Sequence, residues 1–157
     1  EADLQDSTQV VVDILSRFMF ETVLFERRND RELSAHELCD LMLDAQRETY
    51  GDGLDEALYH PYMWAVKPHY YSAVFYNFPY MFGLLFGLGI YAKYRSSPQG
   101  FVDRYESLLS ATGMESAAPL ADRFGIDITR PEFWESSLAL IAEDIQRFER
   151  LVGGAHS

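Results

Sequence analysis

The sequence predicts an all-α fold of six to seven helices, and three observations support this prediction. Apolar residues recur at helical spacing along several segments, helix-capping motifs precede two of them, and no segment alternates strictly as a half-buried strand would. The chain has 157 residues, 48% of them hydrophobic, so it can bury a core. That length suits one domain, or one lobe of something larger.

Two helices are expected in the first third of the chain. The first carries an apolar stripe of 3.6-residue period over about residues 6–28. The second begins at a capping box formed by Ser34 and Glu37, and its stripe ends at Gly51. Residues 51–69 are rich in aromatic side chains without a clear period, which predicts an irregular connection that could close over a ligand.

The rest of the chain predicts four further helices, over about residues 77–94, 97–112, 116–124 and 130–152, with Gly113 and Gly125 ending the second and the third. Asn77 is the candidate cap of the first of these, and a second capping box of Thr129 and Glu132 opens the last. The last helix is expected to bury one face made of Trp134, Leu138, Ile141, Ile145, Phe148 and Val152.

Charge and cysteine content exclude several classes of function. The chain has 13 Lys and Arg against 25 Asp and Glu, a net charge of −12, which would repel nucleic acid and anionic lipid. Cys39 is the only cysteine, so an intramolecular disulfide and a cysteine-based structural zinc site are excluded, which fits a reducing compartment. The chain begins at Glu1 without an initiator Met or a signal segment, and we expect it to be part of a longer protein.

An uncharged stretch over residues 70–92 is long enough to cross a bilayer. It contains polar and proline interruptions that are costly in lipid, namely Ser72, Asn77 and Pro79. We therefore expect a buried core helix, with an integral membrane protein as the rival interpretation. In a core helix, close approach of a neighbouring backbone would be allowed by Gly83, Gly87 and Gly89.

The tyrosines point to a possible site of chemistry. All ten lie between Tyr50 and Tyr105, and four of them accompany His69 within residues 69–80. Tyr76 and Tyr80 are four residues apart and share a face of any helix that contains both. Protonated phenols beside an imidazole could donate hydrogen bonds to a developing oxyanion. Equally, these could be core aromatics whose hydroxyls bind backbone carbonyls.

Other candidate residues carry weaker signals. His36 and Glu37 resemble the start of a zinc-binding His-Glu-x-x-His helix, but Asp40 stands where the second His belongs, and the capping box explains the pair better. His60 lies in the expected loop and could contact substrate or face solvent. Cys39 is expected to be an inert helix residue. A solvated acidic face is expected from Asp3, Asp6 and Asp13.

Three segments together resemble the C-terminal third of the oligoendopeptidase F family, zinc metalloendopeptidases related to the thimet oligopeptidases. The segments are Glu-Thr-Tyr-Gly-Asp at 48–52, His-Pro-Tyr-Met-Trp at 60–64, and the long aromatic block over 69–87. The resemblance extends over about residues 10–152 and includes the flanks 15–21 and 124–128.

The resemblance implies one lobe of a larger helical metallopeptidase that hydrolyses short peptides in the cytoplasm. In that family a His-Glu-x-x-His helix and a downstream Glu bind zinc, and those ligands are absent from this sequence. Zinc would therefore be bound by residues outside this chain, in the N-terminal part of the same protein, and this chain alone is expected to be inactive.

The same resemblance assigns site residues to this chain. His69 and Tyr76 correspond best to the catalytic His and the oxyanion-donating Tyr, and the substrate-binding groups would be Tyr71, Tyr80, Tyr70 and His60. The choice among the four tyrosines stays open because branches of the family space these residues differently. Partners would be peptides and the missing N-terminal part, with no nucleic acid or membrane; self-association into a homo-oligomer is possible. The alternative is a non-catalytic helical interaction protein on the same scaffold.

Overall fold

The computed structural model of the chain describes residues 1–73 and 75–153, and over these residues it is helical with connecting turns. No β-strand forms within them; the only ladder contact is an isolated bridge between Thr112 and Glu115. The all-α prediction is confirmed.

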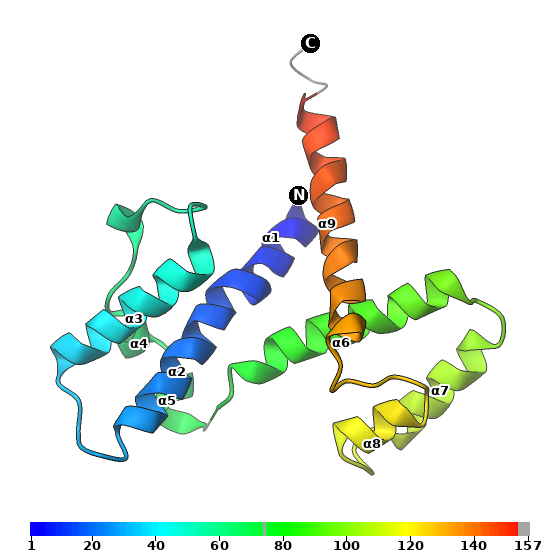
Figure 1. Cartoon of the computed structure of the whole chain (residues 1–157), viewed down its shortest axis with the longest axis horizontal. Helices are drawn as coiled ribbons and strands as arrows, with labels where there is room; N and C mark the ends of the chain where they lie inside the picture. Colours follow the sequence, from blue (N-terminus) through cyan, green and yellow to red (C-terminus); the bar gives the residue numbers. More distant parts are fainter. Residues whose placement is uncertain (74, 154–157) are drawn as a thin grey trace. The chain divides into compact units, whose positions relative to one another are not determined.

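The chain divides into two compact units, Glu1–Gly83 and Leu84–Ser157. The boundary falls within one helix, α6 (Phe78–Ser96), whose first turns count with the first unit and whose remainder counts with the second. Figure 1 labels the helices in chain order.

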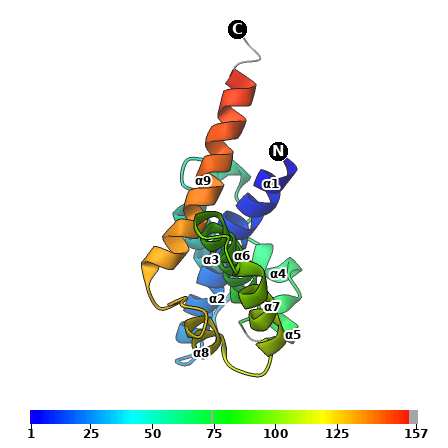
Figure 2. The ribbon, with the colours of Figure 1, turned by 90° about the vertical axis from the view of Figure 1, so that its right-hand side faces the viewer.

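The first unit is built on two long helical segments. One is continuous and consists of α1 (Ala2–Thr8), the π-helical segment η1 (Gln9–Ile14) and α2 (Leu15–Arg27), so it begins earlier than expected. The other is α3 (Ala35–Tyr50), which lies beside α2 (Figures 1 and 2).

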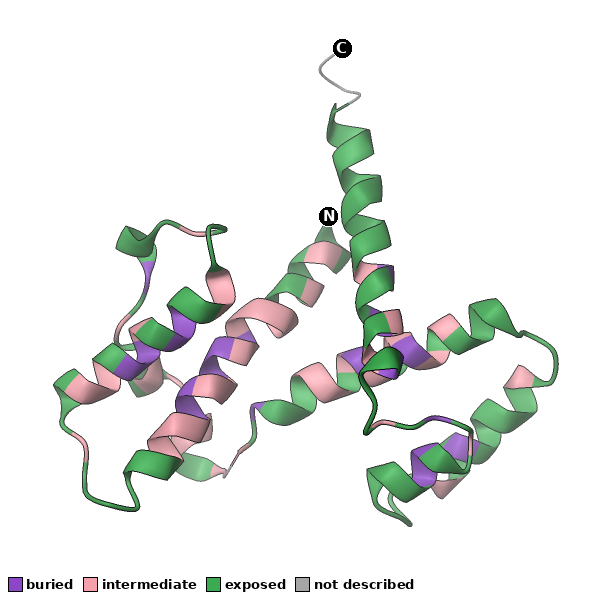
Figure 3. Ribbon diagram, in the orientation of Figure 1, coloured by how far each residue is buried: buried purple, intermediate pink, exposed green. Residues whose placement is uncertain are grey.

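Apolar side chains of α2 and α3 form the core of this unit. Phe20, Leu41, Met42 and Ala45 are buried in one cluster, and Figure 3 shows buried positions along both helices. This is the arrangement that the apolar stripes predict, because each helix buries the face that its periodicity makes apolar.

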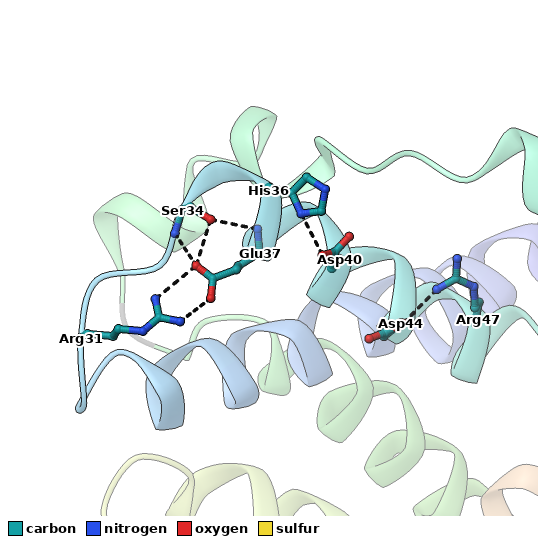
Figure 4. A network of polar contacts seen from close by, with 7 residues as sticks. All are labelled: Arg31, Ser34, His36, Glu37, Asp40, Asp44 and Arg47. Atoms are coloured by element: carbon teal, nitrogen blue, oxygen red, sulfur yellow. Dashed lines mark hydrogen bonds and ion pairs between the residues drawn. The ribbon is translucent and has the colours of Figure 1, made fainter.

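The capping box at the start of α3 is formed as predicted (Figure 4). The Ser34 hydroxyl accepts a hydrogen bond from the Glu37 backbone N–H at 3.3 Å, and the Glu37 carboxylate accepts one from the Ser34 N–H at 2.9 Å. These two bonds satisfy donors that the first turn of a helix otherwise leaves without partners.

Short turns connect α3 to α6: the 3-10 turn η2 (Glu56–Leu58), α4 (Met63–Val66) and α5 (His69–Ser72). The uncharged stretch is therefore not one continuous helix, since α5 ends at Ser72 and α6 begins at Phe78. Among the described residues, no helix combines the length and apolar character needed to cross a bilayer.

The second unit contains the rest of α6 together with α7 (Phe101–Ala111), α8 (Ala117–Asp122) and α9 (Pro131–Gly153). Helices α7 and α8 lie next to each other (Figures 1 and 2). The expected start of α7 at residues 97–98 is wrong, because that segment forms a turn that ends at Gly100, with φ of 63°. The glycines expected to end α7 and α8 do lie in the left-handed region, with φ of 84° at Gly113 and 67° at Gly125.

The terminal helix begins near its expected position but with different contacts. The backbone N–H of Thr129 donates to Asp127 at 2.9 Å, and Glu132 pairs with Arg130 at 3.1 Å, so the second capping box is not formed. Pro131 occupies the first helical position, where its missing N–H leaves no hydrogen bond unmade.

The buried face of α9 is also shifted from the predicted one. Its buried residues are Phe133, Ser137 and Leu140, whereas Leu138, Ile145, Phe148 and Val152 of the predicted face are exposed. The shift follows from the contacts with α6, because the Ser137 hydroxyl donates to the Leu85 carbonyl at 2.6 Å and so turns this face inward.

The sequence predicts that all three glycines of α6 allow a neighbouring segment to approach closely, but only one of them does so. A Cβ built at Gly83 or Gly87 meets no atom within 4 Å, whereas one at Gly89 would lie 2.4 Å from the Phe133 ring and 2.8 Å from the Ser137 hydroxyl. Only Leu85 and Gly89 of α6 are buried, so the expectation of a core helix holds for a narrow strip of it.

Candidate functional site

Three of the predicted site residues lie together in the first unit. The His69 ring is centred 5.2 Å from the Tyr76 ring and 6.1 Å from the Tyr80 ring, and the two tyrosine rings are 5.7 Å apart and nearly perpendicular. His69 begins α5, Tyr76 lies in the connection to α6, and Tyr80 is in the first turn of α6. We call these three residues the His–Tyr cluster.

The cluster presents its phenols to solvent. Tyr76 is 47% exposed and Tyr80 is 38% exposed. Within the described part of the chain, neither hydroxyl makes a hydrogen bond, so both can donate to a ligand. The Nδ1 atom of His69 is buried without a hydrogen-bond partner among the same residues.

A buried carboxylate anchors the connection that carries Tyr76. Glu21 on α2 is fully buried and accepts a hydrogen bond from the backbone N–H of Phe75 at 3.0 Å. Its other oxygen accepts one from the side-chain amide of Asn77 at 2.9 Å, and Asn77 is buried too. Tyr76 is thus held between two neighbours that bind the same carboxylate.

Backbone strain accompanies this anchor. Phe75 has φ of 52°, a left-handed conformation that non-glycine residues rarely adopt because Cβ crowds the backbone. Its bond to Glu21 and the contact of its ring with Phe25, at 4.8 Å between centroids, hold it there. Strain of this kind persists only where surrounding contacts impose it, and it often marks functional sites.

Sequence reasoning missed Glu21 and gave Asn77 only a capping role. A signal was present, because Asp13, Arg17 and Glu21 follow one another at four-residue spacing and so share one face of the first helix. A line of charges on a helix that packs against another helix must find buried partners.

Asp13 and Arg17, the other two members of that line, also have partners inside the protein. The expectation that Asp13 belongs to a solvated face is therefore wrong. Asp13 forms an ion pair with the buried Arg17 and accepts a hydrogen bond from the Tyr50 hydroxyl at 3.0 Å. Burial, together with the adjacent Asp13 carboxylate, raises the pKa of Tyr50 to about 12.

Two further predicted tyrosines have structural partners. Tyr70 packs edge-on against Phe20 in the core at 5.2 Å between centroids, and its hydroxyl donates to the Arg17 carbonyl at 3.4 Å. Burial raises the pKa of Tyr70. Tyr71 is exposed and donates to the Trp64 carbonyl at 3.3 Å. Neither joins the ring contacts of the His–Tyr cluster.

His60 lies on the surface, and its backbone is held by Gln46, a residue that the sequence alone does not single out. The buried side chain of Gln46 accepts from the His60 N–H at 2.9 Å and donates to the His60 carbonyl at 3.1 Å. This pair of bonds sets the path of the loop after α3. Gln46 has no local motif that would reveal this role.

The described residues provide no zinc site. His36 pairs with Asp40 at 3.0 Å on the exposed face of α3, while Glu37 is engaged by Ser34 and Arg31 (Figure 4). No group of three or more His, Cys, Asp or Glu side chains among the described residues could hold a metal ion. The sequence interpretation of His36 and Glu37 as a capping motif, rather than a zinc motif, agrees with these contacts.

In chemical terms, the His–Tyr cluster offers an imidazole and two neutral phenol donors close to one point of the surface. Such donors can bind a peptide carbonyl and stabilise negative charge that develops on its oxygen. Comparison with known proteins assigns no role to these residues, since no family model, curated protein or solved structure matches the chain.

Proposed function

We propose that this chain is the C-terminal part of a zinc-dependent oligoendopeptidase of the oligoendopeptidase F type, acting on short peptides in the cytoplasm. The observation that carries the proposal is the His–Tyr cluster, because it brings His69, Tyr76 and Tyr80 into mutual contact. These are residues that the resemblance assigns to the catalytic and substrate-binding groups. The chain would be one lobe of a larger helical enzyme, with zinc bound by residues outside it.

Within this proposal Tyr76 is the oxyanion donor. When water attacks the scissile carbonyl, charge moves to the carbonyl oxygen, and a phenol placed there donates a hydrogen bond that strengthens as the charge develops. Tyr76 is about half exposed, its hydroxyl makes no hydrogen bond among the described residues, and both of its neighbours, Phe75 and Asn77, bind Glu21. A donor held in place in this way needs little rearrangement during the reaction.

The other two members of the cluster bind and orient the substrate. The Tyr80 ring lies 5.7 Å from the Tyr76 ring, and its hydroxyl likewise makes no hydrogen bond within the described part of the chain, so we assign it to a second carbonyl of the peptide. The His69 ring contacts both phenol rings at a tilted angle and limits the positions that they can take. Tyr70, Tyr71 and His60 are the further substrate-binding residues that the resemblance implies, although the hydroxyls of Tyr70 and Tyr71 bind backbone carbonyls and the backbone of His60 is held by Gln46.

The test uses the intact protein, that is, this chain together with the sequence encoded upstream of it. Tyr76→Phe should lower kcat for a quenched-fluorescence peptide by about 100- to 1,000-fold, the usual effect of removing one oxyanion donor. Zinc content, measured by mass spectrometry, should stay unchanged because Tyr76 is not a ligand.

The matched control is Tyr62→Phe, which removes a hydroxyl from another exposed tyrosine of the first unit, 56% exposed. This variant should retain the wild-type kcat. An unchanged kcat in Tyr76→Phe would reject the role of Tyr76. Peptide binding without any hydrolysis by the intact protein would instead support the alternative of a non-catalytic interaction protein.

A further inference from the structure

The second unit contains a crevice of about 250 Å³ that the proposed peptidase chemistry does not use. Its walls are the C-terminal end of α6, one face of α7 and the segment that follows α8. The crevice is amphiphilic, with basic and hydroxyl groups as well as buried apolar side chains along its walls.

Two cations supply the polar wall. The Lys93 ammonium donates to the Gly125 carbonyl at 2.6 Å, which holds it at the crevice between α6 and the segment after α8. Arg104 on α7 is the second cation, and within the described part of the chain no ion pair engages it. The hydroxyls of Ser96, Ser97 and Tyr105 also line the crevice.

Arg104 differs in this respect from three other arginines of this unit, which acids neutralise: Arg95 pairs with Glu143 at 2.7 Å, Arg130 with Glu132 at 3.1 Å, and Arg123 with Glu115. Arg147 and Arg150 also have no ion pair among the described residues, but they do not line the crevice. The chain has a net charge of −12, so most of its surface repels anions. The crevice, where Lys93 and Arg104 have no acidic partner within the part of the chain that the structure describes, attracts them instead.

The apolar wall limits what that anion can be. Leu108 and Ile126 are buried at the crevice, and Ile90, Phe101 and Phe124 are half-buried there. Phe101 and Tyr105 stack with ring centroids 5.9 Å apart, which gives this side of the crevice a flat aromatic face. The volume is below the roughly 300–1,000 Å³ of sites for drug-sized ligands, and it suits one aromatic or branched aliphatic group.

We infer that this crevice binds a carboxylate that lies next to an apolar side chain. Arg104 would pair with the carboxylate through two parallel hydrogen bonds, Lys93 would add charge, and the apolar group would cover Leu108 and Ile126. Two sources share this chemistry: the C-terminal residue of a peptide, and a free aromatic acid. The site is separate from the His–Tyr cluster and does not depend on peptidase activity.

Isothermal titration calorimetry of the chain, at low ionic strength, tests the ligand chemistry. N-acetyl-L-phenylalanine should bind at least about tenfold more tightly than its amide, which lacks the charge, and than N-acetylglycine, which lacks the ring. Acetyl-Ala-Phe and 3-phenylpropionate then distinguish the sources, because tighter binding of the dipeptide identifies a peptide terminus, and equal or weaker binding identifies a free acid.

Arg104→Gln tests the location. It should weaken binding of the acid about tenfold or more and leave the amide unaffected, since a charge-assisted hydrogen bond is lost. The matched control is Arg123→Gln, which removes a surface arginine of the same unit that does not line the crevice. The inference is overturned if acid and amide bind equally, if Arg104→Gln has no effect, or if no saturable binding occurs up to about 10 mM.

Discussion

Buried polar side chains determine the local geometry of the first unit. Glu21, Gln46 and Asn77 are each almost completely buried, and each is hydrogen-bonded to a segment outside its own helical turn. An unpaired polar group at such a position costs about 1–3 kcal/mol, so the partners are fixed to one arrangement. Glu37, a surface residue, contributes to the stability of the fold in another way, because its neighbours stabilise the charged form of its carboxylate.

Glu37 gives a pH-dependence that can be measured. The Arg31 guanidinium, followed by the Ser34 N–H and hydroxyl, lowers the pKa of Glu37 from its usual range to about 2. Because the folded pKa lies below the unfolded value of about 4.3, the charged form stabilises the fold above about pH 4.3, and this contribution is lost as the pH falls towards 2.

The variant Glu37→Gln isolates this effect, since glutamine also serves in a capping box but carries no charge. Wild type should be more stable than the variant at about pH 5–7, and the two should converge near pH 2, as judged by thermal unfolding at each pH. Carboxyl chemical shifts from NMR should give a Glu37 midpoint near 2. A midpoint near the unperturbed value would contradict the observed pairing.

At the scale of a helix, two glycines of α6 that are two positions apart differ in whether packing requires them. Gly87 and Gly89 lie in the same helix and have the same low helix propensity. Gly87 faces open space within 4 Å, whereas Gly89 lies under the Phe133 ring and the Ser137 hydroxyl of α9. The absence of a side chain is therefore required for packing at Gly89 and not at Gly87.

Alanine substitution separates the two roles. Gly89→Ala should destabilise the protein by about 1–3 kcal/mol, because the new Cβ forces the buried Phe133 ring out of its place. Gly87→Ala should stabilise it by about 0.5–1 kcal/mol, because alanine favours the helix and nothing obstructs its methyl group. Urea unfolding followed by circular dichroism measures both. Equal effects of the two changes would show that α9 does not pack on Gly89 in solution.

For the molecule as a whole, contacts between segments that are distant in the sequence decide how the helices pack within each unit. In the first unit, Glu21 binds residues 54 and 56 positions later, Phe75 and Asn77. In the second, the Ser137 hydroxyl binds the carbonyl of Leu85, 52 positions earlier. Both contacts bury a polar side chain of one helix against the backbone or side chain of a remote segment.

The contact between Glu21 and Asn77 can be tested by exchanging the carboxylate and the amide between the two positions. Glu21→Gln should destabilise the fold by about 1–3 kcal/mol, since an amide can accept only one of the two hydrogen bonds and its NH₂ opposes the other donor. Asn77→Asp alone should destabilise it as well, because two buried carboxylates would face each other.

The double variant Glu21→Gln with Asn77→Asp should recover most of the lost stability. The amide introduced by Glu21→Gln can then accept from the Phe75 N–H and donate to the new carboxylate, so that every buried group is paired again. Chemical denaturation of the four proteins gives the coupling free energy of this cycle. Additive losses in the double variant would rule out the direct contact between these side chains.

The sequence by itself determined the approximate course of the long helices, the Ser34 capping box, the glycine stops at Gly113 and Gly125, and the concentration of tyrosines around His69. These features depend on interactions within about four residues of the chain, which spacing and residue type reveal directly. Of the candidate site, it placed His69, Tyr76 and Tyr80 within one short segment, and their rings do lie together, although Tyr76 precedes α6 and so shares no helix with Tyr80.

Only the tertiary structure decided which polar groups are buried and which face of each helix packs. It showed that Glu21 anchors the segment of Tyr76, that Asp13 binds Arg17 and Tyr50, and that α9 buries the face of Phe133 and Ser137. The physical reason is that a buried charge or a close-packed face is defined by its partner. When that partner is more than fifty residues away, no local pattern contains it.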